Sequence, residues 1–353
     1  MNGNRILIVK PSSLGDVVHT LPVVHGLKRC FPGCFIGWII QAGYIPLVQA
    51  DPAVDAVHAI EIPSTSDPHA DRGVYLQALR ATLVSLAALR RELRRSPYDL
   101  VLDLHGSFRS GLLGRANPGG RRYGFADARE LNPLFQDERV AVPTGVEHAI
   151  EKNLLFLDVL GCKRAAEDFH LCCSPADHEE AAAVLAAAGI RTDRKVVYCN
   201  AAARWKTKFW PAAHWAELAD LLQAQGVDVV FGGSRQDGPY LESIGRRMNT
   251  TPIMVAGRMG LGGLTALLLR SAVYVGLDSG PMHMAAMAGI PVVALFGPTH
   301  PERVAPYGVE HRILRNQSLD CLGCRRRSCS HATCMNTIQV SEVLQAVLEF
   351  IAS

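Results

Sequence analysis

The sequence predicts an α/β protein made of two Rossmann-like domains, each built on a parallel sheet. Short runs of aliphatic and β-branched residues alternate with longer stretches of helical periodicity along the whole chain. Neither pattern crosses the stretch between Gly161 and Ala176, which divides the alternation into two sets. The chain has 353 residues, 48% of them apolar, which is enough for two domains of ordinary size with large cores.

The first set of elements is predicted to form a domain of residues 1–168. Its buried strands are expected at Ile6–Val9, Phe35–Ile40, Val57–Ile62 and Leu100–Leu104. Its helical patterns cover Val17–Cys30, Val74–Arg95, Phe108–Arg115 and Glu147–Leu160. Because helices separate successive strands, the connections are expected to be crossovers and the strands parallel.

The second set is predicted to form a domain of residues 169–353, with the last helix able to pack back on the first domain. Its strands are expected at Val196–Cys199, Val227–Phe231, Ile253–Val255, Val273–Val275 and Val292–Phe296. Its helices are expected at Pro175–Ala188, Pro211–Gln225, Leu241–Met248, Leu264–Ser271 and Met282–Ala288. Such sheets bind ligands beyond the carboxyl ends of their strands, so two facing domains would place the site in an interdomain cleft.

Charge and hydropathy exclude two classes of protein. With 36 Lys and Arg against 33 Asp and Glu, the net charge is only +3, too little for a dedicated nucleic-acid binder. No apolar run reaches the length of a membrane-spanning helix. The apolar stretch within Met1–Lys10 is too short for a signal peptide, so a cytosolic location is expected.

The loop after the first strand, Lys10–Asp16, carries the first candidate site. Gly15 lets the backbone approach a ligand closely, and Ser13 with the following helix N-terminus offers donors for an anion. Asp16 would lie at the mouth of the cleft. The alternative is that Asp16 only caps the following helix, as residue type alone favours.

Two loops of the second half carry cations or backbone donors at strand ends. Arg204, Lys206 and Lys208 precede a helix that begins at a proline, which suits a diphosphate, although a solvated basic loop is the alternative. Further along, Asp278-Ser-Gly-Pro opens a helix that carries His283 in its first turn. Here Asp278 as an N-cap and His283 as a core residue are the competing interpretations.

These motifs resemble glycosyltransferase family 9, the ADP-heptose:lipopolysaccharide heptosyltransferases. The resemblance rests on Lys-Pro-Ser-Ser-Leu-Gly-Asp-Val-Val-His-Thr-Leu-Pro at 10–22 and on Asp-Ser-Gly-Pro-Met-His-Met-Ala-Ala at 278–286. The first motif is most similar to that of heptosyltransferase I. Similar residues also occur at Tyr98–Asp103, Gly106, Ala128–Glu130, Glu147–Ala149 and Phe209–Pro211, so the resemblance covers nearly the whole chain.

The resemblance implies an inverting transferase of the GT-B fold that needs no catalytic metal or other cofactor. Its donor would be ADP-heptose, bound by the C-terminal domain, and its acceptor a lipid-anchored, Kdo-containing lipopolysaccharide precursor, bound by the N-terminal domain. Such an enzyme works in the cytoplasm, peripheral on the cytoplasmic face of the inner membrane, and binds no nucleic acid.

The resemblance and the strand-end loops together assign roles to individual residues. Asp16 matches the general base, and Lys208 matches a lysine that contacts phosphate. Donor contacts are expected at Ser13, Gly15, Arg204, Asp237, Asp278, Ser279, Gly280 and His283. Acceptor contacts are expected at Lys10, Arg129 and His148, which suit a carboxylate or phosphate.

The chain departs from heptosyltransferase I in the phosphate loop. Ala202 and Ala203 stand where hydroxyl residues are found there, and one residue is added around Trp205–Thr207. A family 9 transferase with another donor or acceptor is therefore the first alternative. A nucleotide-sugar-binding protein without transfer activity is the second, and such a binder would have no need of Asp16.

Ten cysteines and an arginine cluster complete the candidate features. Six cysteines, Cys30, Cys34, Cys162, Cys172, Cys173 and Cys199, are expected as free thiols, most of them buried. The other four, Cys321, Cys324, Cys329 and Cys334, are numerous enough for a structural zinc site, with free thiols or a disulfide as alternatives. The arginines Arg90, Arg91, Arg94 and Arg95 close a long helix, where they suit its C-terminal dipole or an anionic membrane surface.

Overall fold

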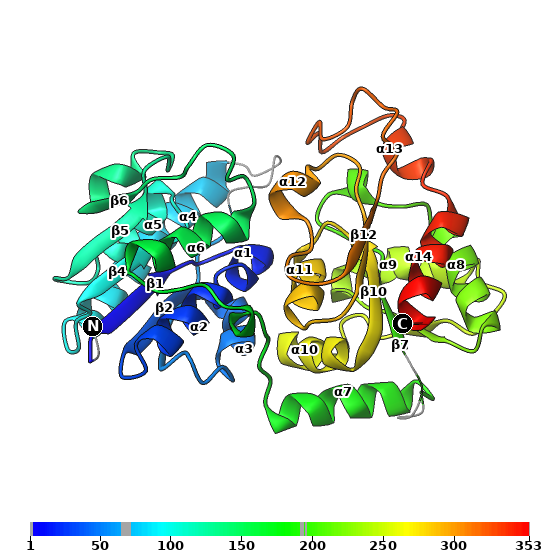
Figure 1. The fold of residues 1–353 in the computed structure, drawn as a ribbon, viewed down its shortest axis with the longest axis horizontal. Helices are drawn as coiled ribbons and strands as arrows, with labels where there is room; N and C mark the ends of the chain where they lie inside the picture. Colours follow the sequence, from blue (N-terminus) through cyan, green and yellow to red (C-terminus); the bar gives the residue numbers. More distant parts are fainter. Residues whose placement is uncertain (1–2, 65–71, 191–193, 195, 353) are drawn as a thin grey trace. The chain divides into compact units, whose positions relative to one another are not determined.

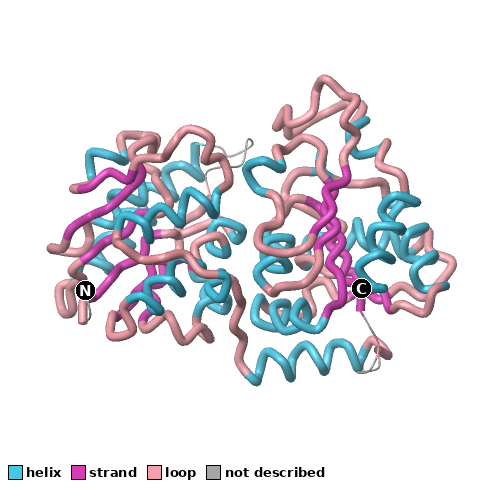
Figure 2. The backbone as a smooth tube through the Cα atoms, in the orientation of Figure 1, coloured by secondary structure: helices cyan, strands magenta, loops and turns pink. Residues whose placement is uncertain are grey.

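The computed structural model describes residues 3–64, 72–190, 194 and 196–352. The chain divides into two compact units, Met1–Asp168 and Phe169–Ser353. Each unit is an α/β domain with one six-stranded sheet, and Figures 1 and 2 show helices flanking the strands in both. None of the helices in the described part of the chain is long and apolar enough to cross a bilayer.

The first sheet has the strand order β3-β2-β1-β4-β5-β6, with every neighbouring pair parallel. Its strands are β1 (Arg5–Val9), β2 (Phe35–Gln41), β3 (Ala56–Ile60), β4 (Leu100–Asp103), β5 (Arg121–Phe125) and β6 (Glu138–Val140). Its helices are α1 (Leu14–Val18), α2 (Leu21–Cys30), α3 (Ile45–Val48), α4 (Arg72–Leu93), α5 (Phe108–Gly114) and α6 (Ala149–Val159), with short 3₁₀ turns at Ala42–Tyr44, Asn132–Phe135 and Ala166–Asp168. The central strands are buried on both faces, as parallel sheets require.

The second sheet has the order β12-β11-β10-β7-β8-β9, again parallel throughout. Its strands are β7 (Val196–Asn200), β8 (Asp228–Phe231), β9 (Ile253–Met254), β10 (Ser271–Leu277), β11 (Val292–Leu295) and β12 (His311–Leu314). Its helices are α7 (Pro175–Ala187), α8 (Ala212–Ala224), α9 (Gly238–Gly245), α10 (Leu261–Arg270), α11 (Gly280–Met287), α12 (Pro301–Val304), α13 (Thr333–Asn336) and α14 (Val340–Ala352), with 3₁₀ turns at Lys206–Lys208 and Arg235–Asp237.

The two sheets have the same topology. Counting strands from the start of each unit, both follow the Rossmann order 3-2-1-4-5-6. The chain leaves β1 toward β2 on one side and returns to β4 on the other, and β7, β8 and β10 repeat this arrangement. Ligands of such sheets bind at this switch point, beyond the carboxyl ends of the two central strands. The α/β fold and its parallel sheets are therefore confirmed, and each unit has one expected binding position.

Sequence periodicity misplaced several elements. The predicted helix Val17–Cys30 is two helices, because Pro22 lacks an N–H and is tolerated only in the first turn of α2. Strands β5, β6 and β12 were missed because they are short or rich in charged residues and lie at or near a sheet edge. The last helix, α14, packs on α8 and on strands β10, β11 and β12 of its own unit.

The prediction of free thiols was wrong for one pair. Cys30, at the end of α2, forms a disulfide with Cys162, beyond the end of α6, across a Cα–Cα distance of 5.7 Å. The two helices pack together, which brings residues 132 positions apart into contact. Cys34 and Cys199 are buried free thiols as expected, whereas Cys172 and Cys173 are only half-buried.

Candidate functional site

The first candidate site lies at the switch point of the first sheet. The loop after β1 carries Lys10, Ser13 and Asp16, and the loop after β4 carries His105. Val9 at the end of β1 is aligned with Asp103 at the end of β4, so the two loops leave the sheet side by side.

Asp16 is the third residue of α1 and closes a capping box with Ser13. Its Oδ2 accepts hydrogen bonds from the Ser13 N–H at 2.9 Å and the Ser13 hydroxyl at 2.7 Å. Its side chain nevertheless remains 43% exposed, and Oδ1 takes no part in the cap. The capping interpretation is therefore correct for one carboxylate oxygen and leaves the other available for chemistry.

Lys10 controls the charge state of this carboxylate. Its ammonium group is buried, donates to the Leu104 carbonyl at 2.5 Å and lies 3.8 Å from Asp16 Oδ1. Burial by itself would raise the pKa of Asp16, but the positive charge of Lys10 and the two hydrogen bonds from Ser13 outweigh it and lower that pKa below its usual range. Asp16 is thus an ionised, partly exposed carboxylate at neutral pH.

Sequence reasoning missed His105 as a site residue. Burial lowers its pKa, and the charge of Lys10 lowers it further, against the attraction of Asp16 and Asp103. The imidazole is therefore neutral near pH 7. Its loop is held by the buried Asp103, whose Oδ1 accepts the N–H groups of His105 and Gly106 at 3.0 Å each. Its position directly after a predicted strand was the available signal.

The two other expected acceptor residues follow β5 and β6 at the same edge of the sheet. Arg129 is an exposed residue in the loop after β5. His148 is the N-cap of α6, where its Nδ1 accepts from the Ile150 N–H at 3.2 Å. Its ring lies 6.0 Å from the buried ring of His19, which follows α1. Hydrogen bonds and a short ion pair join Lys10, Ser13 and Asp16, and His105 interacts electrostatically with Lys10 and Asp16.

The second candidate site lies at the switch point of the second sheet, beyond β7 and β10. Lys208 donates to the Asp278 carbonyl and to its Oδ2, each at 2.8 Å. Both side chains are largely buried, with exposures of 14% and 10%. An ammonium group has three N–H donors, so this arrangement leaves the third for a ligand. The pair fixes Lys208 beside the N-terminus of α11.

The start of α11 supplies further groups. Asn200, at the end of β7, donates to the Ser279 hydroxyl at 3.1 Å and so joins the two central strands. Ser279 is the N-cap of α11 and Gly280 its first residue, which leaves backbone N–H groups at the helix start. His283 is buried, with its Nε2 4.0 Å from Asp278 Oδ1.

Asp237 and Arg204, both expected to contact the donor, lie on the loops after β8 and β7. Asp237 closes a capping box like that of Asp16, accepting the N–H and hydroxyl of Ser234 at 2.7 Å each. It lies at the end of the loop after β8, next to the switch point rather than in it. Arg204 is exposed in the loop after β7.

Two buried tyrosines on the central strands β7 and β10 were also not selected from the sequence. Tyr198 on β7 and Tyr274 on β10 are aligned, and their rings stack at 5.9 Å. Burial raises the pKa of both phenols far above the usual value. Their hydroxyl ends occupy the space that side chains at Gly232 and Gly276 would fill. Those two glycines are therefore needed for packing beneath the loops.

The predicted zinc site has no support in the described part of the chain, where no group of three or more His, Cys, Asp or Glu is arranged to hold a metal ion. Cys321, Cys324 and Cys329 are exposed, whereas Cys334 is buried with the hydrophobic core.

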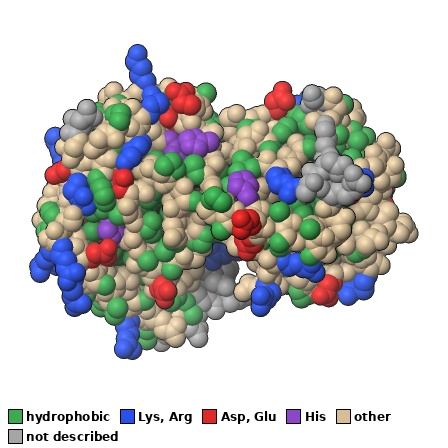
Figure 3. All heavy atoms as spheres, turned by 90° about the horizontal axis from the view of Figure 1, so that it is seen from below, with side chains coloured by type: hydrophobic (Ala, Val, Ile, Leu, Met, Phe, Trp, Pro, Cys, Tyr) green, Lys and Arg blue, Asp and Glu red, His purple; other side chains and the backbone are tan. Residues whose placement is uncertain are grey.

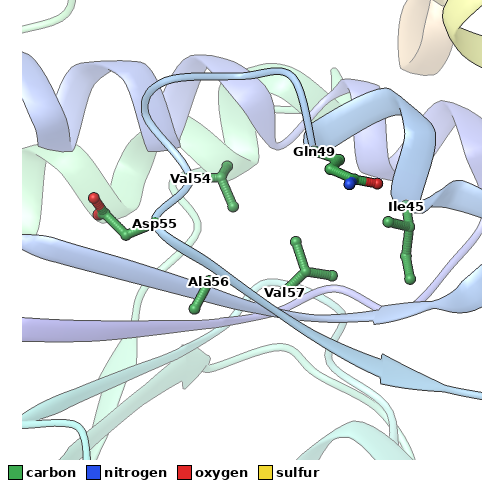
Figure 4. Close-up of a pocket in the computed structure, with 6 residues that line it drawn as sticks. All are labelled: Ile45, Gln49, Val54, Asp55, Ala56 and Val57. Atoms are coloured by element: carbon green, nitrogen blue, oxygen red, sulfur yellow. The ribbon is translucent and has the colours of Figure 1, made fainter.

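A surface depression in the first unit is unrelated to either switch point. It is lined by Ile45, Gln49, Val54, Asp55, Ala56 and Val57 (Figure 4). Its carboxylate, Asp55, is already bound by Lys28 at 2.6 Å and by the Ile36 N–H at 2.7 Å. The depression therefore offers no chemistry comparable to that of the strand ends.

Comparison with known proteins identifies the family. The model of glycosyltransferase family 9 (heptosyltransferase) matches residues 86–334. The chain belongs to glycosyltransferase family 9. It is 28% identical to lipopolysaccharide heptosyltransferase 1 of Pseudomonas aeruginosa over 332 residues, which cover 93% of this chain and 88% of that protein.

The solved structures agree with this family 9 assignment at the level of the fold. A glycosyl transferase family 9 protein from Veillonella parvula superposes with a TM-score of 0.84 at 22% identity, covering 100% of this chain and 99% of that one. Escherichia coli heptosyltransferase WaaC, solved with ADP-2-deoxy-2-fluoro heptose, superposes with a TM-score of 0.72 at 24% identity, covering 98% and 99%. The protein is thus a family 9 glycosyltransferase with the GT-B fold.

Proposed function

We propose that this glycosyltransferase moves heptose, with inversion, from ADP-heptose to the Kdo/heptose inner core of a lipid-anchored lipopolysaccharide precursor. Two features support the proposal. The first switch point has an ionised, half-exposed carboxylate, Asp16, and the second has Lys208 and the N-terminus of α11. The names of the relatives, lipopolysaccharide heptosyltransferase 1 among them, support the acceptor, and the sugar nucleotide bound to WaaC supports the donor.

In the proposed reaction, an acceptor hydroxyl oxygen attacks the anomeric carbon as the bond from that carbon to the diphosphate oxygen breaks. The hydroxyl proton passes to Asp16, whose Oδ1 is not used by the helix cap. Lys10 lowers the pKa of Asp16, which keeps the carboxylate ready to accept the proton. The lowered pKa also makes Asp16 a weak base. The proton is therefore expected to move late, once the hydroxyl oxygen has begun to bond to the anomeric carbon and its proton has become acidic.

Negative charge grows on the departing ADP, and the second switch point has the groups to stabilise it. Lys208 uses two of its three N–H groups to bind Asp278, and α11 begins directly after Asp278, with Ser279 as its N-cap. His283 lies close by, with its Nε2 4.0 Å from Asp278 Oδ1. The proposal assigns charge neutralisation to these groups, with no catalytic metal or cofactor.

On the acceptor side, the proposal assigns binding of an anionic Kdo carboxylate or phosphate to Lys10, Arg129 and His148. Arg129 is exposed and has the planar donor geometry that suits both anions. Lys10 is already bound to Leu104 and attracted to Asp16, so its principal role is to set the charge of the base.

A lipid-anchored acceptor requires contact with a membrane, and α4 has a suitable surface. Leu76, Leu79 and Leu83 are each more than half exposed and recur at three- and four-residue intervals, so they share one face. Arg90 and Arg94 continue that face. Exposed apolar side chains beside cations are typical of a helix that lies on an anionic leaflet. We propose that α4 holds the enzyme on the cytoplasmic face of the inner membrane.

Vesicle flotation tests the membrane contact. The pair Leu79→Ser and Leu83→Ser, and separately glutamine at Arg90, Arg91, Arg94 and Arg95, should each weaken binding to anionic vesicles several-fold and leave binding to neutral vesicles low. Leu221→Ser on α8, also a partly exposed leucine, is the control. Unchanged flotation of both α4 variants would remove this part of the proposal.

A donor and acceptor panel tests the reaction itself. ADP-heptose is compared with UDP- and GDP-sugars on a Kdo-containing lipid acceptor, and products are identified by mass spectrometry. Transfer of heptose from ADP-heptose alone is expected. Ala202 and Ala203 lack the hydroxyl groups found at these positions in heptosyltransferase I, which is why another donor is considered. Transfer of a different sugar would favour that alternative family 9 activity. Sugar-nucleotide binding without transfer would favour the non-catalytic alternative.

A further inference from the structure

A basic segment of the second unit lies against the loop after β7. This segment, Cys324–Cys329, contains three consecutive arginines and is exposed along its whole length. It follows β12 along the chain by about ten residues, yet its neighbours in space are loops at the carboxyl ends of other strands. Its hydrogen bonds to Pro298 and Thr207 and its ring contact with Trp205 lie within the second unit.

Two sets of hydrogen bonds hold the segment in place. The Arg325 N–H donates to the Pro298 carbonyl at 2.7 Å, and the Gly323 N–H donates to the Gly297 carbonyl at 3.1 Å, which ties the segment to the loop after β11. On the other side, the Thr207 hydroxyl donates to the Arg326 carbonyl at 2.9 Å. Thr207 is buried and belongs to the same 3₁₀ turn as Lys208.

Trp205 brings an arginine of this segment close to Lys208. The Arg327 guanidinium carbon lies 5.1 Å from the centre of the Trp205 ring, and Lys208 Nζ lies 4.9 Å from the same centre. The two cations are therefore no more than about 10 Å apart, both held by one aromatic ring. Asp278 already compensates part of the charge of Lys208, so a second cation in this region would add attraction for a diphosphate, which carries more than one negative charge.

We propose that Arg327 binds the diphosphate of the nucleotide donor, as a second cation beside Lys208. Ala202 and Ala203, near the start of the loop after β7, have no side-chain donors, so the loop itself offers little beyond its cations. A guanidinium presents paired N–H donors that match two oxygens of a phosphate. The ligand class is a nucleoside diphosphate or its sugar ester. This inference rests on the proposed function, because it assumes that the second switch point binds such a ligand.

Binding of nucleotides by the full-length protein tests the inference. Isothermal titration calorimetry is run with ADP, AMP and adenosine on the wild type, Arg327→Gln and Arg325→Gln. Arg325→Gln is the matched control, because it removes the same charge from the same segment, and Arg325 is anchored through its backbone. Arg327→Gln should weaken ADP binding about tenfold, the expected loss of one charge-assisted hydrogen bond at a solvent-exposed position. AMP should be affected less and adenosine not at all.

Two further variants separate contact from general electrostatics. Arg327→Lys should recover part of the loss, since it restores the charge without the paired donors. Thr207→Val removes the anchor to Arg326 while keeping the volume, and should weaken ADP binding less than Arg327→Gln. Thermal melting confirms that each variant is folded.

The outcomes distinguish this inference from the proposed function. If the wild type binds ADP and Arg327→Gln binds it equally well, or if Arg325→Gln loses as much as Arg327→Gln, the specific role of Arg327 is overturned while the proposed function stands. If the wild type binds no ADP, both are overturned. The inference is supported if Arg327→Gln alone loses affinity and if the loss of affinity increases from adenosine through AMP to ADP.

Discussion

The two units share one topology and differ in the charge at the point where it binds ligands. At the first switch point a carboxylate, Asp16, is held ionised by a buried lysine. At the second, a lysine is held by a carboxylate, and both this lysine and Arg327 lie against the ring of Trp205. Basic and acidic side chains are interspersed on the face that Figure 3 presents, which fits a net charge of only +3. The specialisation is therefore local to the strand ends and does not appear in the overall charge.

This comparison shows how one scaffold serves two tasks. The strand order fixes where a ligand binds, because the two central strands connect to opposite sides of the sheet. The residues of the loops then decide whether the site removes a proton or stabilises a leaving anion. Asp16 and Asp237 illustrate the point, since both close the same Ser-x-x-Asp cap after a strand. Within the described part of the chain, a lysine lies beside the second oxygen of Asp16 but not beside that of Asp237.

Removing the carboxylate of the first site should have the largest effect. Asp16→Asn keeps the shape of the cap but removes the proton acceptor, so kcat should fall by about 10²–10⁴-fold while ADP binding changes little. Steady-state kinetics and calorimetry measure the two. Asp177→Asn is the control, because Asp177 closes an equivalent cap with Ser174 on α7, with both bonds at 2.7 Å. Equal loss in the control would mean that helix capping, not catalysis, explains the effect.

Removing the lysine of the second site should have the next largest effect, and of a different kind. Lys208→Gln should lower kcat about 10²-fold and also weaken ADP binding. The positive charge of Lys208 is expected to stabilise the diphosphate both in the bound donor and in the transition state. Lys206→Gln, an exposed neighbour in the same 3₁₀ turn, should be nearly silent. If Lys208→Gln spared ADP binding, the two units would not be divided between base and leaving group as proposed.

The pH dependence of the first site should change when Lys10 is removed. The pKa of Asp16 is lowered in the folded protein, so the carboxylate loses its charge only as the pH falls below the usual value of 3.8. Lys10→Met removes the main attraction, and the pKa of Asp16 should rise. The acid limb of kcat/KM should therefore move to higher pH. At neutral pH, Lys10→Met should reduce the rate less than Asp16→Asn does. An unmoved acid limb would show that Lys10 does not control Asp16.

The smallest expected effect concerns stability and is confined to the first unit. His25 is buried between Asp51 and the Asp168 carbonyl, each at 2.7 Å. Burial alone would lower its pKa, but the hydrogen bond and charge of Asp51 and the contact with Asp168 raise it overall. A raised pKa stabilises the fold fully below about pH 6.5, the unfolded value, and this contribution is lost as the pH rises through the folded value.

Hydrogen exchange measured from pH 5.5 to pH 9 follows this contribution. Opening of α2 and its neighbours should become easier as the pH rises, and His25→Gln should flatten that dependence. The second unit should not share it. A pH trend that is equal in both units, or unchanged in His25→Gln, would contradict the assignment to His25.

The sequence by itself determined the class of fold and supplied the candidate residues of the site. Strands with apolar residues on both faces, alternating with helices, require parallel sheets, and residues that follow such strands must lie at one sheet edge. Lys10, Asp16, Lys208 and Asp278 all follow buried strands, but strand position alone left Asp16 open as a helix cap and Lys208 open as a solvated cation. Their assigned roles came from the resemblance to glycosyltransferase family 9.

The tertiary structure decided what depends on contacts between distant segments. The disulfide of Cys30 with Cys162, the place of His105 beside Lys10, and the approach of Arg327 to Trp205 each join segments more than ninety residues apart. Local periodicity reports only which face of an element is apolar, and it carries no information about which distant face packs against it. For that reason the sequence supplied the catalytic candidates, whereas only the packing of loops and helices revealed what sets their charge.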